Sequence, residues 1–282
     1  MEKDIRKSVI AGTWYPGDPD TLRGVIRRYL DSASVKPVDG PVIGLVSPHA
    51  GYLYSGPIAA HGYRLIEGQR YDAVVVIGPS HRVLFRGASV WPSGGYETPL
   101  GVVPVDSELA GAILGGDPVM NTDRRPHASE HSVEIQLPFL QVALGSFAFV
   151  PLVMGTQDLR TCEAVAESVW RAAKGKNVLL VGSSDLSHFH SYEQAKRLDG
   201  AVVDLVRKRD YRGLARELED GSCEACGGGP VVTAMLVAEK AGARGVQVLR
   251  YANSGDVTGD RRQVVGYLSA AFFRETAGEK GA

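Results

Sequence analysis

Three histidines each follow a short apolar run of the chain that ends in glycine, serine or proline. The runs with their histidines cover residues 42–49, 73–81 and 177–188. Such runs are typical of buried strands, and ligands of open α/β sheets bind just beyond the carboxyl ends of the strands. We therefore expect His49, His81 and His188 to meet in one crevice, where imidazoles could bind a transition metal or transfer protons.

A carboxylate lies three residues before the third of these histidines. This carboxylate, Asp185, could be a metal ligand, or it could accept the proton of an imidazole and so fix its tautomer. His188 itself could be a ligand or a general base, since an unperturbed imidazole pKa of about 6.5 suits proton transfer near neutrality. His61, His127 and His190 are expected to be structural or at the surface.

Cys226 is a further candidate, because it stands just before three glycines and Pro230, where we expect a helix to begin. The dipole and free N–H groups of a helix N-terminus favour a thiolate, which is both a nucleophile and a soft metal ligand. Cys223 and Cys226 also form a Cys-x-x-Cys pair, for which disulfide redox chemistry is a weaker alternative. Cys162 lies on the apolar face of a predicted helix and is expected to be buried.

The polar segment 130–134 has two alternative interpretations. Glu130 and His131 could contribute a carboxylate to the crevice or a hydrogen bond that orients a metal-binding histidine. Alternatively, Ser132 caps a helix whose positive end attracts the two nearby acids. The aromatic residues could line the mouth of the crevice or simply pack in the core; they are Trp14, Tyr15, Tyr52 and Tyr54.

Strands and helices alternate along the chain without repeats or a break in composition, so we predict one α/β domain over residues 1–282. Asp18 is expected to cap the first helix, with Pro19 at its first position. A second helix is expected to begin near Pro57, after the His49 loop. Residues 253–260 are expected to form a loop between the last two strands.

The composition excludes several classes of protein. Apolar residues make up 44% of the chain and charged residues 22%, as in ordinary globular domains. A net charge of −1 gives no electrostatic basis for binding nucleic acid or an anionic membrane. The sequence has no apolar stretch that could span a bilayer, no signal peptide and too few cysteines for a disulfide framework. We therefore expect a cytoplasmic protein without nucleic-acid or membrane partners.

Several of these motifs in combination resemble the Memo family. The matching stretches are residues 11–15, 47–56, 78–81, 130–139, 183–188 and 251–256. The resemblance extends from about Val9 to Phe272, nearly the whole chain. It implies a single three-layer α/β/α domain with a mostly parallel central sheet, similar to the class III extradiol dioxygenases, which are non-haem iron(II) enzymes.

The resemblance also implies roles for individual residues. His49 and His81 match the two metal-ligand histidines, and Cys226 falls where the dioxygenases have a ligand glutamate. His188 matches the acid/base histidine, with Asp185 beside it. Because a thiolate is softer than a carboxylate, iron(II) or copper is the expected metal. We expect a set of residues around the bound ligand: Trp14, Tyr54, Glu130 and His131.

The expected function is a metal-dependent redox or dioxygenase-type activity on an unknown substrate. One alternative is a catalytically inactive module that binds a small molecule, a peptide or a small anion in the crevice, attracted by cationic histidines and helix ends. Another is hydrolysis with Cys226 as nucleophile and His188 as base. The resemblance further implies phosphopeptide binding and motility signalling in eukaryotic relatives, and association with radical-SAM and AMMECR-type proteins in microbial ones.

Overall fold

The computed structural model describes residues 4–115 and 117–275, so both ends of the predicted domain, 1–3 and 276–282, lie outside the described residues. The strands are β1 (Ile5–Arg6), β2 (Val42–Ser47), β3 (Ala73–Pro79), β4 (Ala88–Val90), β5 (Gly95–Thr98), β6 (Gly101–Pro104), β7 (Met120–Asn121), β8 (Phe149–Met154), β9 (Val178–Ser183), β10 (Asp185–His190), β11 (Gly245–Asn253) and β12 (Val264–Phe273). The helices are α1 (Pro19–Ser32), α2 (Tyr52–Leu65), α3 (Ser107–Leu114), α4 (Arg125–Ala128), the 3₁₀ helix η1 (Glu134–Gln136), α5 (Leu137–Leu144), α6 (Leu159–Ala172), α7 (Tyr192–Lys208), α8 (Tyr211–Glu219), α9 (Gly228–Lys240) and α10 (Ser254–Thr258).

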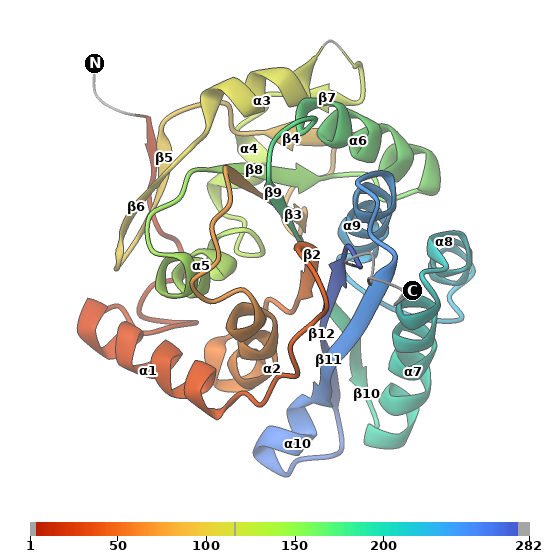
Figure 1. The fold of residues 1–282 in the computed structure, drawn as a ribbon. Coiled ribbons are helices and arrows are strands. Elements are labelled where there is room, and N and C mark those ends of the chain that lie inside the picture. Colours follow the sequence, from red (N-terminus) through yellow and green to blue (C-terminus); the bar gives the residue numbers. More distant parts are fainter. Residues whose placement is uncertain (1–3, 116, 276–282) are drawn as a thin grey trace, which may run out of the picture.

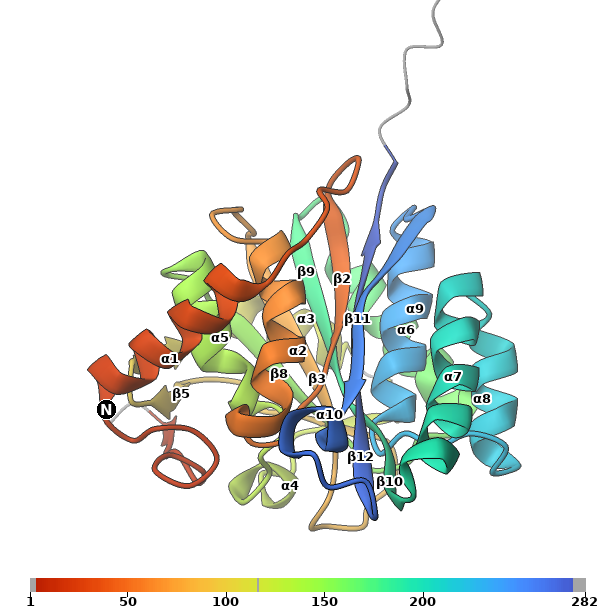
Figure 2. The same ribbon diagram turned by 90° about the horizontal axis from the view of Figure 1, so that it is seen from below.

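Helices cover both faces of a large central sheet (Figure 1). The strand order is β10-β12-β2-β9-β3-β8-β4-β7, and β11 also pairs with β12. Seen along the sheet, α1, α2 and α5 lie on one side, while α6, α7, α8 and α9 lie on the other (Figure 2). The central strands β2, β9, β3 and β8 are parallel, and antiparallel strands flank them. The predicted three-layer α/β/α architecture is therefore confirmed.

The carboxyl ends of the central strands lie at one edge of the sheet. All residues of β2 and β3 are buried, as expected for parallel strands covered on both faces. Ser47 at the end of β2 pairs with Ser183 at the end of β9, and Ile77 of β3 pairs with Gly182. The sheet thus brings the segments that follow β2 and β3, with their histidines, to the same edge.

His188 reaches this edge in a way that differs from the prediction. The third run does not end in a loop with a histidine, because β9 stops at Ser183 and a separate strand, β10, starts at Asp185. β10 pairs antiparallel with β12, with register shifts on both sides of His188. Phe189 has a left-handed backbone with φ of 62°, which is uncommon for a bulky residue. The register shifts are β-bulges, and they let β10 change the direction of its side chains within a few residues.

Other local predictions are confirmed or wrong in specific ways. Asp18 accepts a hydrogen bond from Thr21 N and caps α1, as expected. The helix after the His49 loop begins at Tyr52, so Pro57 lies inside it and costs α2 a hydrogen bond. Residues 253–260 are not simply a loop, because Asn253 starts the short helix α10 with a capping box.

Ser132 does not cap a helix, which corrects one of the two interpretations of its segment. Its hydroxyl donates to the carbonyl of Pro79, the last residue of β3, on a distant part of the chain. The helical run starts later, as the 3₁₀ helix η1, and continues into α5. In the part of the chain that the structure describes, no helix has the length and apolar character to cross a bilayer.

Candidate metal centre

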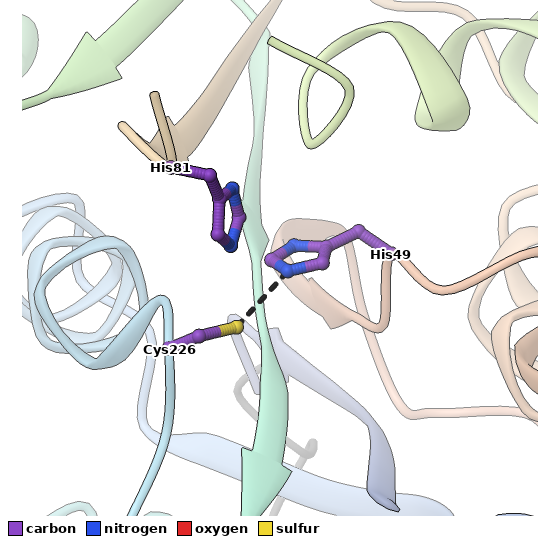
Figure 3. A group of neighbouring side chains, drawn as sticks. All are labelled: His49, His81 and Cys226. Carbon is purple, nitrogen blue, oxygen red and sulfur yellow. Dashed lines mark hydrogen bonds between the residues drawn. The ribbon is translucent and has the colours of Figure 1, made fainter. Parts of the chain in front are cut away.

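His49, His81 and Cys226 converge beyond the carboxyl ends of the central strands. Each offers one ligand atom, and the three atoms lie within 4.8 Å of one another. His49 Nε2 is 3.0 Å from Cys226 Sγ, although 177 positions separate the two residues in the chain. The three side chains point toward one another from three different segments (Figure 3). The structure therefore brings together the three residues predicted as metal ligands.

The spacing of these atoms suits one metal ion. Nitrogen and sulfur ligands bind metals at about 2.0–2.3 Å, which places two ligands of a tetrahedral site about 3.4–3.8 Å apart. The His49–Cys226 separation of 3.0 Å, and the limit of 4.8 Å within which all three ligand atoms lie, are compatible with that range. Two imidazoles and one thiolate are a donor set that iron, copper and zinc accept. The residues present thus fit a transition metal.

The hydrogen bonds behind His49 assign the proton of its imidazole. Gln136 Nε2 donates to the carbonyl that precedes His49, at 3.0 Å, and to Ser183 Oγ, at 2.7 Å. Ser183 donates its only hydroxyl proton to the carbonyl of Ser132, at 2.6 Å. Ser183 can therefore only accept from His49 Nδ1, 3.0 Å away. His49 consequently carries its proton on Nδ1, and its bare Nε2 faces Cys226.

Glu130 fixes His81 in the same way. Its Oε1 accepts from His81 Nδ1 at 2.9 Å, and its Oε2 accepts from the backbone N–H of His81 at 2.7 Å. Burial opposes ionisation of Glu130, but the hydrogen bonds from His81 lower its pKa to about 2. The proton of His81 is thus on Nδ1, and Nε2 is free. Glu130 lies behind His81 and orients it, one of the two roles considered for it, and is not among the residues that line the pocket described below.

His131 lies between two rings of the site, stacked on His81 and tilted against Trp14. Its ring centroid is 4.3 Å from that of Trp14 and 4.5 Å from that of His81. Burial lowers the pKa of His131 to about 4, so the ring is neutral at pH 7. His81, Glu130 and His131 form a second group with ligand atoms within 4.8 Å. Because the Glu130 oxygens already accept four N–H groups, we assign the metal to the first group.

Asp185 and His188 border the site without being paired to each other. Asp185 Oδ1 accepts from the backbone N–H of His49 at 2.7 Å, and burial raises the pKa of this carboxyl to about 7. The His188 ring is oriented by a hydrogen bond that its Nδ1–H donates to the carbonyl of Leu186, at 2.8 Å. Burial lowers the pKa of His188, so its unprotonated Nε2 is available. Asp185 thus positions the His49 loop, and Leu186 orients His188.

Cys226 is held close to the end of β9 and to Asp185. Its backbone N–H donates to the carbonyl of Asp185 at 3.2 Å, two residues before α9 begins. Burial and the Asp185 carboxylate raise the pKa of the Cys226 thiol, opposite to the direction expected from a helix end. Without a metal the thiol therefore keeps its proton and can donate it to His49 Nε2. Cys223 is a separate, buried free thiol.

Gly227 allows this close approach, and an alanine there is expected to disturb it. A Cβ at Gly227 would lie 2.2 Å from the carbonyl oxygen of Ser183 and 2.8 Å from Ser184 Cβ. Gly227→Ala should lower the free energy of unfolding by about 1–3 kcal/mol, measured by chemical denaturation. The control Gly200→Ala on α7, whose Cβ would meet no atom within 4 Å, should be neutral or stabilising by up to about 1 kcal/mol. Equal stabilities of the two variants would contradict the expected contact.

His49 and His81 line a pocket of about 780 Å³. Trp14, Tyr54 and His131 line it as predicted, together with Asp185 and His188. Tyr15 and Tyr52 are buried instead, and their hydroxyls donate to Glu134 and to the carbonyl of Ile135. The lining residues that were not singled out as candidates from the sequence include Phe189, Thr258, Gln263, Val265 and Tyr267. Phe189 follows directly on the His188 motif, whereas Tyr267 comes from the middle of β12 and has no local signal.

Comparisons with known proteins agree with the architecture. The chain matches the family model described as Memo-like protein over residues 6–271. A MEMO1 family protein of Methanopyrus kandleri is 39% identical over 280 residues, covering 95% of this chain and 99% of that protein. Another from Sulfolobus acidocaldarius is 38% identical over 283 residues, with the same coverage. The crystal structure of an uncharacterized Escherichia coli K12 protein has the same fold, with a TM-score of 0.58 at 14% identity, over 82% of this chain and 99% of that one.

Proposed function

The chain belongs to the Memo-like protein family, and from this membership and the site geometry we propose that it is a metal-dependent redox protein. The metal would be iron or copper, held by His49, His81 and Cys226. One observation carries the proposal, namely three ligand atoms from distant segments within 4.8 Å of one another. Two of them, His49 and His81, line a pocket large enough for a small organic substrate.

Iron or copper, when bound, supplies redox chemistry beside this pocket. The residues of the chain would bind the substrate and move its protons. Trp14 and Tyr54 would contact apolar parts of the substrate, since both line the pocket. His188, neutral and with a free Nε2, would accept a proton from a substrate hydroxyl within hydrogen-bond reach. The oxidoreductase or dioxygenase-type reaction is supported by this combination of ligands and base.

A second candidate is a catalytically inactive binding module that uses the same pocket. Phe189 is 68% exposed and Tyr54 is 38% exposed at the pocket, an arrangement common at binding surfaces. In this alternative a peptide or small anionic ligand keeps its affinity after the metal is chelated. The redox proposal instead predicts that chelation abolishes electron transfer.

Metal content tests the main proposal directly. Under anaerobic, reducing conditions the wild type should bind one equivalent of iron(II) or copper(I), measured by elemental analysis after gel filtration. Cys226→Ser and His49→Ala each remove a ligand and should bring the metal content to background. Cobalt(II) added to the wild type should give a sulfur-to-metal charge-transfer absorption that is absent in Cys226→Ser.

Matched controls separate ligand loss from general damage. Cys223→Ala removes a thiol three positions away, and His61→Ala removes an imidazole whose Nδ1 bonds to the carbonyl of Pro57 in α2. Both should retain the wild-type metal content. If wild type, ligand variants and controls all bind equally little metal, the proposed function is wrong.

A further inference from the structure

A second cavity reaches the site from another side. It has a volume of about 610 Å³ and is lined by parts of α8, α9, the segment between them, β10 and residues 157–159. His188 lines both cavities, whereas Cys226 lines this one and, among the described residues, is not in the wall of the first. Cys226 enters the cluster from a different direction than the two histidines, on the segment that leads into α9 (Figure 3). The candidate metal centre therefore lies between two openings.

The two cavities differ in charge. Asp158, Glu219 and Glu224 line the second cavity, and no lysine or arginine among the described residues does. Asp158 is held ionised by hydrogen bonds from Thr161, which lower its pKa. Glu224 contacts His190 Nε2 at 2.9 Å, whereas Glu219 takes part in none of the ion pairs of the described residues. In the first pocket, by contrast, the carboxylates are Asp185 and Asp260. Asp185 is buried, and Asp260 is neutralised by Arg262 at 2.7 Å.

The second cavity also carries sulfur. Cys223 and Cys226 both contribute to its wall, and thiols are soft donors that iron and copper bind well. Clefts lined by charges of one sign raise the local concentration of ions of the opposite sign and speed their arrival. A cation drawn in by the three carboxylates would therefore enter a cavity whose wall contains Cys226.

We propose that this second cavity is the route by which metal cations reach Cys226 and the His49–His81–Cys226 cluster. The first pocket then remains free for the organic ligand, so metal can exchange while that ligand is bound. The identity of the cation rests on the proposed function. The selectivity of the route for positive charge does not, and it can be measured on the metal-free protein.

The test compares two methanethiosulfonate reagents that differ in charge, one carrying trimethylammonium and one carrying sulfonate. Each transfers its thioalkyl group to a cysteine sulfur as a mixed disulfide and releases methanesulfinate. The protein used is metal-free Cys223→Ala, in which the one cysteine besides Cys226 is the fully buried Cys162. Peptide mapping measures the modification of Cys226. The ratio of the cationic reagent's rate to the anionic reagent's rate should be about 10-fold or more higher at Cys226 than for a free thiol in solution.

Two sets of variants locate the route. Glu219→Gln with Glu224→Gln should remove most of the preference for the cationic reagent, whereas Glu97→Gln with Glu108→Gln, which line neither cavity, should leave it unchanged. Ala215→Phe narrows the second cavity and should slow modification severalfold. Thr258→Phe, at the first pocket, should not.

Three outcomes would overturn the route. The first is equal charge preference in the Cys223→Ala protein with and without the Glu219→Gln and Glu224→Gln substitutions. The second is slowing by Thr258→Phe but not by Ala215→Phe. The third is no modification of Cys226 by either reagent even at alkaline pH, where more of the thiol is ionised. Cation-selective modification in a protein that binds no metal would contradict the proposed function while leaving the route intact. Normal metal binding without a preference for the cationic reagent would contradict the route while leaving the proposed function intact.

Discussion

Replacing Glu134 with alanine is expected to lower the free energy of unfolding by about 3–5 kcal/mol. The Glu134 side chain is fully buried and pairs with Arg6, whose side chain is 3% exposed, at 2.5 Å. Removal of the carboxylate leaves the guanidinium in the interior without its counter-charge. Breaking a buried pair in this way is costly, even where the intact pair contributes little compared with apolar residues.

The cost extends beyond one ion pair, because Glu134 joins the beginning of the chain to the metal-site segment. Its carboxylate also accepts from Ser8 Oγ at 2.6 Å, Tyr15 OH at 2.8 Å and Val9 N at 3.0 Å. Arg6 in turn donates to the carbonyl of Glu130 at 2.6 Å. The network therefore supports the segment that orients His81, so the variant should also weaken metal binding.

Chemical denaturation of the metal-free protein measures this effect without interference from the site. Glu97→Ala is the matched control, since it removes an exposed carboxylate that pairs with Lys7 at 2.6 Å and should cost about 0–1 kcal/mol. Arg6→Met combined with Glu134→Leu should recover part of the loss, because neither charge then remains buried alone. A loss below about 1 kcal/mol in Glu134→Ala would show that the pair is solvated in solution.

The parts of the site that could be predicted are those encoded by local pattern. His49 and His81 follow the fully buried strands β2 and β3, and parallel pairing brings such ends together whatever lies between them. His188 could not be placed in the same way. Its strand, β10, owes its position and its register shifts to β12, which lies far along the chain and carries no local signal for them.

The hydrogen bonds that orient the metal-binding histidines were harder to predict from the sequence. Glu130 had two open interpretations, because a carboxylate near a helix start resembles one that holds a histidine. Gln136 was missed, although a signal exists. It is the one polar residue in the stretch 135–140, which runs from η1 into α5, and it is 1% exposed. A buried amide in such a stretch requires hydrogen-bond partners. Those partners, Ser183 and the backbone before His49, come from other strands and become visible only in three dimensions.

Replacing Gln136 with leucine is expected to weaken metal binding by about 10–100-fold, the usual cost of losing a group that orients a metal ligand. In the wild type, Gln136 occupies one lone pair of Ser183, whose proton goes to the carbonyl of Ser132. Without the amide, the Ser183 hydroxyl can turn and donate to His49 Nδ1. The imidazole then carries its proton on Nε2, the atom that must be bare to bind the metal.

Nitrogen-15 NMR of the metal-free protein reads this tautomer directly, and competition with a chelator gives the affinity. The wild type should show His49 protonated on Nδ1, and Gln136→Leu a mixture of tautomers. Ser183→Ala should lose affinity similarly, while Ser183→Thr, which keeps the hydroxyl, should restore it. Gln141→Leu is the control, since that amide bonds Thr98 and the carbonyl of Gly101, away from the site. Unchanged tautomer and affinity in Gln136→Leu would mean that the His49 ring is fixed by its metal alone.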